Sequence, residues 1–89
     1  MKTGFKIVYT PTFAKNFRKL PLSIKQKAEL KLSFFKTDPF HPKLKTNKLS
    51  GKLNNYWSFS IDLHYRIVFR FVEEVGILFI DVGTHSVYK

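Results

Sequence analysis

Hydrophobic and polar residues alternate in two separate parts of the chain. Residues 5–9 alternate and are rich in β-formers, which predicts a first strand. The same period of two returns at residues 57–62, which predicts a second strand. Residues 65–72 and 77–82 are strongly apolar and predict two more strands, joined by a turn at residues 73–76.

Between these parts, apolar residues recur at helical spacing. Thr10 followed by Pro11 is typical of a capped helix start, and Pro21 ends this first helix. Ser23 is the expected cap of a second helix of three to four turns. Its predicted inner stripe is Ile24, Ala28, Leu32 and Phe35, and its predicted outer lysines are Lys25, Lys27, Lys31 and Lys36. Residues 38–51, with two prolines and a glycine, predict a loop.

The length and composition limit what the chain can be. Its 89 residues predict one domain, 1–89, with a core built largely from ten phenylalanines. The chain has no cysteine, which excludes disulfides and thiolate metal sites, and no histidine pair has metal-ligand spacing on a helix. We therefore expect no metal and no cofactor. Neither a signal peptide nor a membrane span is visible, which fits a cytoplasmic protein.

Positive charge is the first indication of function. Sixteen lysines and arginines face six acidic residues, which gives a formal net charge of +10. A fold does not need this excess, so a polyanionic partner is indicated, most commonly nucleic acid. The excess is concentrated in the helical part and in residues 43–52, where four lysines occur without an acid.

Arg66 is an unusual residue for an apolar strand. Two interpretations are open: its guanidinium holds a phosphate, or it forms an ion pair with Asp62 or Asp81. From the strand pattern alone, the ion pair is favoured.

The other candidates are histidines, lysines and one tryptophan. His85 follows the last strand after a glycine, where an imidazole suits proton transfer; His41 and His64 are further candidates. An ordinary exposed histidine is the alternative in each case. Candidate phosphate ligands are Lys43, Lys45, Lys48 and Lys52. Trp57 beside these lysines is a candidate for base stacking, although a core position is the more common role.

Four segments resemble the RelE/ParE toxin superfamily. They are Lys48-Leu49-Ser50-Gly51, Tyr56-Trp57-Ser58-Phe59, Tyr65-Arg66-Ile67-Val68-Phe69 and Asp81-Val82-Gly83-Thr84-His85. The similarity extends over nearly the whole chain in order. It implies an α+β, β-α-α-β-β-β microbial RNase-like fold, with two N-terminal helices packed on an antiparallel sheet that the N-terminal strand joins.

The resemblance also implies an activity. Such toxins enter the ribosomal A site and cut mRNA without metal, and a cognate antitoxin keeps them inactive. By this resemblance Arg66 stabilises the transition state, His85 is the general acid, and Tyr88 orients the phosphate or stacks a base. The four lysines, Lys43, Lys45, Lys48 and Lys52, would then hold the RNA.

One position departs from the pattern of the close relatives. Asn47 occupies the place where they often carry a histidine or glutamate as general base, and an amide cannot take a proton near neutral pH. His41 or His64 is then the alternative base, or positioning alone activates the 2′-hydroxyl, or the protein is slow or inactive. Two other functions stay open: a ParE-like DNA gyrase inhibitor, and a catalytically weak RNA- or ribosome-binding homologue.

Overall fold

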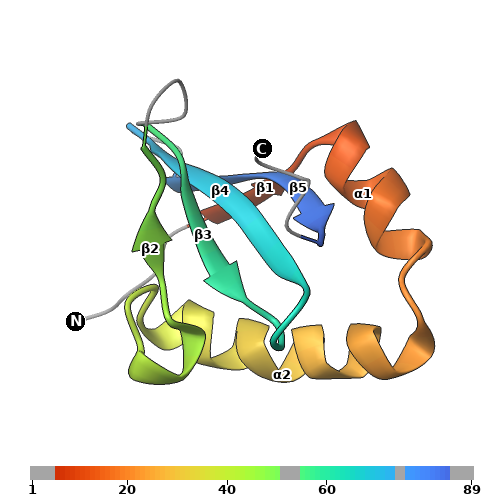
Figure 1. The fold of residues 1–89 in the computed structure, drawn as a ribbon. Coiled ribbons are helices and arrows are strands. Elements are labelled where there is room, and N and C mark those ends of the chain that lie inside the picture. Colours follow the sequence, from red (N-terminus) through yellow and green to blue (C-terminus); the bar gives the residue numbers. More distant parts are fainter. Residues whose placement is uncertain (1–5, 51–54, 74–75, 85–89) are drawn as a thin grey trace.

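The structure is a computed structural model that describes residues 6–50, 55–73 and 76–84. In these residues the elements are β1 Lys6–Tyr9, α1 Pro11–Arg18, α2 Leu22–Thr37, the 3-10 helix η1 Pro42–Leu44, β2 Asn47–Lys48, β3 Trp57–Ser60, β4 Arg66–Val72 and β5 Gly76–Gly83. The long helix α2 lies along one face of the sheet, and α1 lies near β5 (Figure 1).

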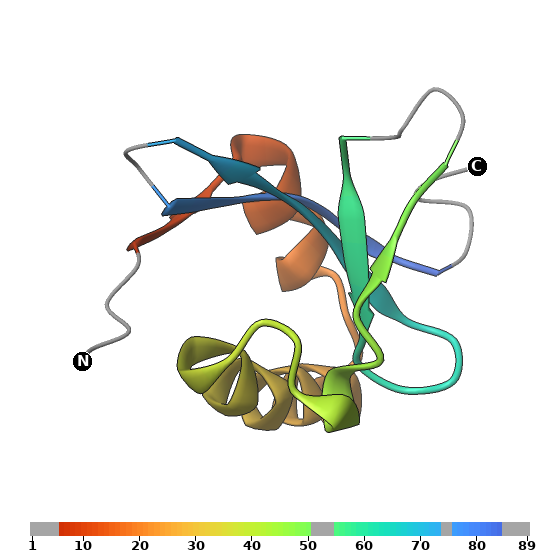
Figure 2. The ribbon, with the colours of Figure 1, turned by 90° about the vertical axis from the view of Figure 1, so that its left-hand side faces the viewer.

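The five strands of the described chain form one sheet in the order β1-β5-β4-β3-β2. β1 runs parallel to β5, and the other neighbouring pairs are antiparallel. The sheet twists strongly, so that β3 runs steeply across the direction of β1 and β5 (Figure 2). The predicted fold class, two helices packed on a sheet that the N-terminal strand joins, is confirmed.

The start of α1 is as predicted, whereas the start of α2 is not. Thr10 Oγ1 accepts a hydrogen bond from the backbone N–H of Phe13 at 3.0 Å and donates one to the carbonyl of Ile80 in β5 at 2.9 Å. This one side chain therefore caps α1 and ties it to the sheet. The predicted cap at Ser23 was wrong, because α2 begins at Leu22 directly after Pro21, and no side chain caps it.

Aromatic rings fill the space between α2 and the sheet. Phe35 is fully buried, and its ring centroid lies 4.9 Å from Phe59, 5.1 Å from Phe69 and 5.4 Å from Phe79. These partners come from β3, β4 and β5, so one helical side chain contacts three adjacent strands. The predicted inner stripe of α2 is confirmed, with Leu32 partly buried and its other members buried.

The segment predicted as a plain loop contains regular structure. Residues 42–44 form η1, and Asn47 and Lys48 form the short edge strand β2, paired with Ser58 and Trp57 of β3. A strand of two residues has no periodicity of its own and forms only because β3 offers it a partner. The prediction of a loop across residues 38–51 was therefore wrong for residues 42–44 and 47–48.

No helix in the described part of the chain combines the length and apolarity needed to cross a membrane.

We predict that Phe35→Ala lowers the free energy of unfolding by about 3–5 kcal/mol, because it removes the ring that joins α2 to three strands. Urea denaturation followed by circular dichroism measures this. Leu22→Ala on the same helix is the control: Leu22 is 70% exposed, and its loss should change the free energy by less than about 0.5 kcal/mol. Similar small losses in both variants would contradict the central role of Phe35.

Candidate functional site

Arg66 begins β4 and lies between the ends of two other strands. Its backbone pairs with Ser60 of β3 on one side and with Gly83 of β5 on the other. Its guanidinium Nη1 donates a hydrogen bond of 2.7 Å to the hydroxyl of Ser60, which is itself buried. A neutral hydroxyl orients the guanidinium and leaves its positive charge uncompensated.

The two carboxylates that were candidate ion-pair partners of Arg66 are engaged elsewhere. Asp62 Oδ1 accepts the backbone N–H groups of His64 and Tyr65, both at 2.8 Å. Asp81 Oδ1 accepts from the side-chain amide of Asn16 at 2.7 Å. Within residues 6–50, 55–73 and 76–84, no ion pair joins Arg66 to either carboxylate, so the ion-pair interpretation was wrong.

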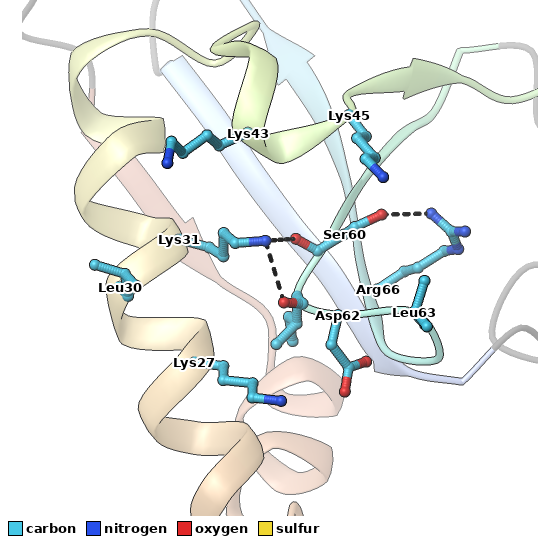
Figure 3. A pocket seen from close by; sticks show the side chains of 10 residues that line it. Lys27, Leu30, Lys31, Lys43, Lys45, Ser60, Asp62, Leu63 and Arg66 are labelled. Carbon is cyan, nitrogen blue, oxygen red and sulfur yellow. Dashed lines mark hydrogen bonds between the residues drawn. The ribbon is translucent and has the colours of Figure 1, made fainter.

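Arg66 borders a hollow of about 430 Å³ between α2 and the turn from β3 to β4. We call it the lysine hollow, because Lys27 and Lys31 enter it from α2, and Lys43 and Lys45 from the η1 segment (Figure 3). Asp62 is the one acidic residue on its described walls. The hollow therefore presents an excess of positive charge without enough carboxylates to balance it, which suits a phosphate or another anion.

Lys31 forms the inner wall of this hollow. Its Nζ donates to the backbone carbonyls of Ser60 at 3.4 Å and Ile61 at 3.2 Å. Burial lowers the pKa of Lys31, and the positive charges of Lys45, Lys27 and Lys43 lower it further, against an opposing effect of Asp62. The prediction that Lys31 faces outward was wrong, because it lies one helical turn before the buried Phe35.

A second hollow shares Leu63 and Arg66 with the lysine hollow. It measures about 460 Å³ and is lined by Leu63, His64, Tyr65, Arg66 and Thr84. Thr84 directly follows Gly83, the residue that pairs with Arg66. The end of β5 therefore lies beside Arg66, which lines both hollows.

The remaining predicted site residues lie in four different places. His64 lines the second hollow with Arg66. His41 lies apart from this hollow: its Nδ1 accepts the backbone N–H of Lys43 at 3.1 Å, and its ring lies 4.6 Å from that of Phe34. Lys48 lies over the ring of Trp57 at 6.0 Å, away from the lysine hollow. His85, Tyr88 and Lys52 lie outside the described residues.

Sequence reasoning missed three residues of this site, which are Ser60, Lys27 and Lys31. Ser60 had a signal, because it alternates with the apolar residues of β3 and so belongs to the opposite face. The two lysines also had a signal, because Lys31 lies one turn and Lys27 about two turns before Phe35 on the same helix. Across the parts of the chain that the structure describes, no group of histidine, aspartate and glutamate residues is arranged to hold a metal ion.

Comparison with known proteins identifies the class of protein. The fold and the chain are those of a toxin of the RelE/ParE superfamily, as the sequence resemblance predicted. A family model described as the ParE toxin of type II toxin-antitoxin systems, parDE, matches residues 7–87, and the chain belongs to this family. No curated protein matches the sequence.

Solved structures share the fold at low sequence identity. A YoeB/ParE toxin from Agrobacterium tumefaciens has a TM-score of 0.75 at 23% identity, over 91% of this chain and 99% of that one. YafQ from Escherichia coli has a TM-score of 0.70 at 17% identity, over 96% and 98%. The toxin-antitoxin complex RelBE2 from Mycobacterium tuberculosis has a TM-score of 0.69 at 20% identity, over 91% and 98%.

We predict that Asp62→Ala destabilises the protein by about 1 kcal/mol at neutral pH, because the carboxylate holds the turn before Arg66. The backbone N–H of Tyr65 is the main cause that lowers the pKa of Asp62. A lowered folded pKa means that the stabilisation is present above the unfolded pKa of about 4 and is lost as the pH falls through the folded value. Thermal unfolding of both proteins between neutral pH and pH 3 measures this.

The control for this prediction is Asp62→Asn, whose amide oxygen can accept the same hydrogen bonds without titrating. It should lose less stability at neutral pH than Asp62→Ala does. A difference between wild type and Asp62→Ala that stays constant down to pH 3 would contradict the assigned role of the carboxylate.

Proposed function

We propose that this toxin cleaves mRNA on the ribosome, in the cytoplasm, without a metal ion. One observation carries the proposal: Arg66, which has no carboxylate partner among the described residues, borders a hollow walled by four lysines. The same arginine lies beside the end of β5, from which the chain continues to His85. A phosphate in this place would meet the guanidinium of Arg66 and the ammonium groups of several lysines.

The proposed reaction uses the RNA as its own nucleophile. The 2′-hydroxyl attacks the adjacent phosphorus, the bond to the 5′-oxygen breaks, and a 2′,3′-cyclic phosphate forms. Arg66 stabilises the negative charge that develops on the phosphate oxygens. His85 donates a proton to the departing 5′-oxygen, and Tyr88 orients the phosphate or stacks a base. Lys43 and Lys45 hold the neighbouring phosphates in the lysine hollow.

His64 is the better of the two histidine candidates for the base. It borders the second hollow together with Arg66, whereas His41 already accepts a hydrogen bond from the backbone of Lys43. We therefore assign to His64 the removal of the proton from the 2′-hydroxyl, in place of the amide at Asn47.

The proposed protein partner is an antitoxin. Solved relatives of the same fold include the Escherichia coli DinJ-YafQ complex and the Mycobacterium tuberculosis RelBE2 toxin-antitoxin complex. An acidic antitoxin segment would find complementary charge in the lysine hollow and would exclude RNA from it.

The second candidate function is inhibition of DNA gyrase. Two observations favour it: the matching family model is that of the ParE toxins, and Asn47 does not supply a base. The two functions separate in parallel assays. The nuclease cuts mRNA on programmed ribosomes and leaves supercoiling by gyrase intact, and the gyrase inhibitor does the reverse.

We predict that Arg66→Ala and His85→Ala each lower the rate of mRNA cleavage on programmed ribosomes by at least about a hundredfold. Each removes one group that acts on the reacting phosphate, so ribosome binding should persist. Lys25→Ala on α2, outside both hollows, is the control and should cleave at the wild-type rate. Cleavage at wild-type rates in both site variants would exclude the proposed mechanism.

We also predict that affinity for the ribosome falls steeply with salt, because ammonium-phosphate contacts release counterions. The double variant Lys43→Ala with Lys45→Ala should bind more weakly and should reduce the slope of log affinity against log salt by roughly 1–2. The charge-matched control is Lys15→Ala with Lys19→Ala. If the control variant reduces the slope of log affinity against log salt equally, the slope reflects the net charge of the protein and not contacts in the lysine hollow.

A further inference from the structure

Ser60, at the end of β3, receives hydrogen bonds from two cations. The guanidinium Nη1 of Arg66 donates to its hydroxyl at 2.7 Å, and the Nζ of Lys31 donates to its backbone carbonyl at 3.4 Å (Figure 3). Ser60 is only 6% exposed, so the surrounding protein fixes its position. Lys31 and Arg66 are therefore connected through one buried residue, although one belongs to α2 and the other to β4.

Lys31 also holds the residue that follows Ser60. Its Nζ donates to the carbonyl of Ile61 at 3.2 Å, and the backbone N–H of Ile61 donates to the carbonyl of Tyr65 at 2.8 Å. Tyr65 directly precedes Arg66 in the chain. The turn that leads into Arg66 is thus held by the ammonium group of Lys31 as well as by its own hydrogen bonds.

The position of Lys31 is itself well fixed. Lys31 lies one helical turn before Phe35, whose fully buried ring contacts three strands of the sheet. Hydrogen bonds from a charged donor are stronger than those between neutral groups. Lys27, one turn earlier on α2, is exposed and makes no side-chain hydrogen bond within the described residues. Both lysines line the lysine hollow, but only Lys31 of this pair is bonded to the backbone beside Arg66.

We propose that Lys31 is a positioning residue for Arg66: it fixes the backbone of Ser60, whose hydroxyl then orients the guanidinium. Lys31 does not need to touch the RNA for this role. The proposal rests on the proposed function, because it takes Arg66 as the group that stabilises the reacting phosphate. The alternative is that Lys31 only adds charge to the lysine hollow. It would then affect how tightly RNA binds and not how fast the bound RNA is cut.

Single-turnover cleavage on programmed ribosomes separates these two roles. The rate at saturating toxin reports the orientation of Arg66, and the half-saturating concentration reports binding. Lys31→Met keeps a long side chain but has no donor, and it should lower the saturated rate by about tenfold, because a misplaced group loses much of its effect. Lys31→Arg can still donate to two carbonyls and should recover most of the rate. Lys25→Met, outside both hollows, should cleave at the wild-type rate.

A double variant tests the connection through Ser60. Ser60→Ala removes the hydroxyl that orients the guanidinium, so it should itself lower the saturated rate by about tenfold. If Lys31 acts through Ser60, adding Lys31→Met to Ser60→Ala should lower the rate by less than about twofold more, because the connection is already lost. Two independent roles would instead multiply and give about a hundredfold loss.

A measurement without cleavage keeps this proposal apart from the proposed function. The chain has three arginines, Arg18, Arg66 and Arg70, so NMR of isotope-labelled guanidinium groups gives few signals, and Arg66→Lys identifies one of them. A guanidinium that donates a hydrogen bond to a fixed partner rotates slowly about its Nε–Cζ bond. Lys31→Met should accelerate this rotation in Arg66 severalfold. Lys27→Met, which removes the same charge from the same hollow, should leave the rotation unchanged.

Three results would overturn the proposal. They are unchanged rotation of Arg66 in Lys31→Met, a wild-type saturated rate with only weaker binding, and losses that multiply in the double variant. If the wild-type protein cuts no mRNA but Lys31→Met still loosens the guanidinium, the proposed function fails and the positioning role stands. Lys31→Ala is too short to reach the carbonyls and is favourable in a helix, so it repeats the comparison if Lys31→Met does not fold.

Discussion

The contact of Phe35 with phenylalanines on three adjacent strands fixes the rest of the structure. It sets how far along the sheet α2 lies and which side of the helix faces the strands. Lys31 lies one turn earlier on the same helix, so the same contact brings its Nζ to the carbonyls of Ser60 and Ile61. The aromatic core thus determines where positive charge meets the end of the sheet, and the site depends on packing that contains no functional residue.

Strand pairing determines the position of Arg66, as core packing determines that of Lys31. Ser60 of β3 pairs with Arg66 on one side, and Gly83 of β5 pairs with it on the other. The hydroxyl that orients the guanidinium and the end of β5 therefore both lie next to Arg66. Between β4 and β5 the pairing shifts at Val68 and Phe69, which is a local irregularity of the ladder. Backbone pairing with a strand on each side constrains Arg66 more strongly than a loop would.

Local patterns in the sequence predicted the elements, and contacts between distant residues decided the site. The cap at Thr10 and the inner stripe of α2 follow from neighbours within one or two turns, so they were predictable. The edge strand β2 and the hydrogen bond of Arg66 to Ser60 depend on which strands pair. The spacing of hydrophobic residues along the sequence does not give this pairing. Arg66 itself was found because an arginine in an apolar strand is unusual. That no carboxylate of the described residues pairs with it became visible only in three dimensions.

The electrostatic repulsion among the lysines of the lysine hollow also affects what the hollow can bind. Burial lowers the pKa of Lys31 most, and the charges of Lys45, Lys27 and Lys43 lower it further, so the charge of Lys31 is disfavoured in the protein alone. Any polyanion that enters the lysine hollow relieves this repulsion, and it therefore stabilises the folded protein as it binds. An RNA strand and an acidic protein segment would gain from the same source of free energy, so the two would bind there in competition. Under the proposed function, the charge that would hold RNA in the hollow would therefore also attract an acidic segment of the antitoxin.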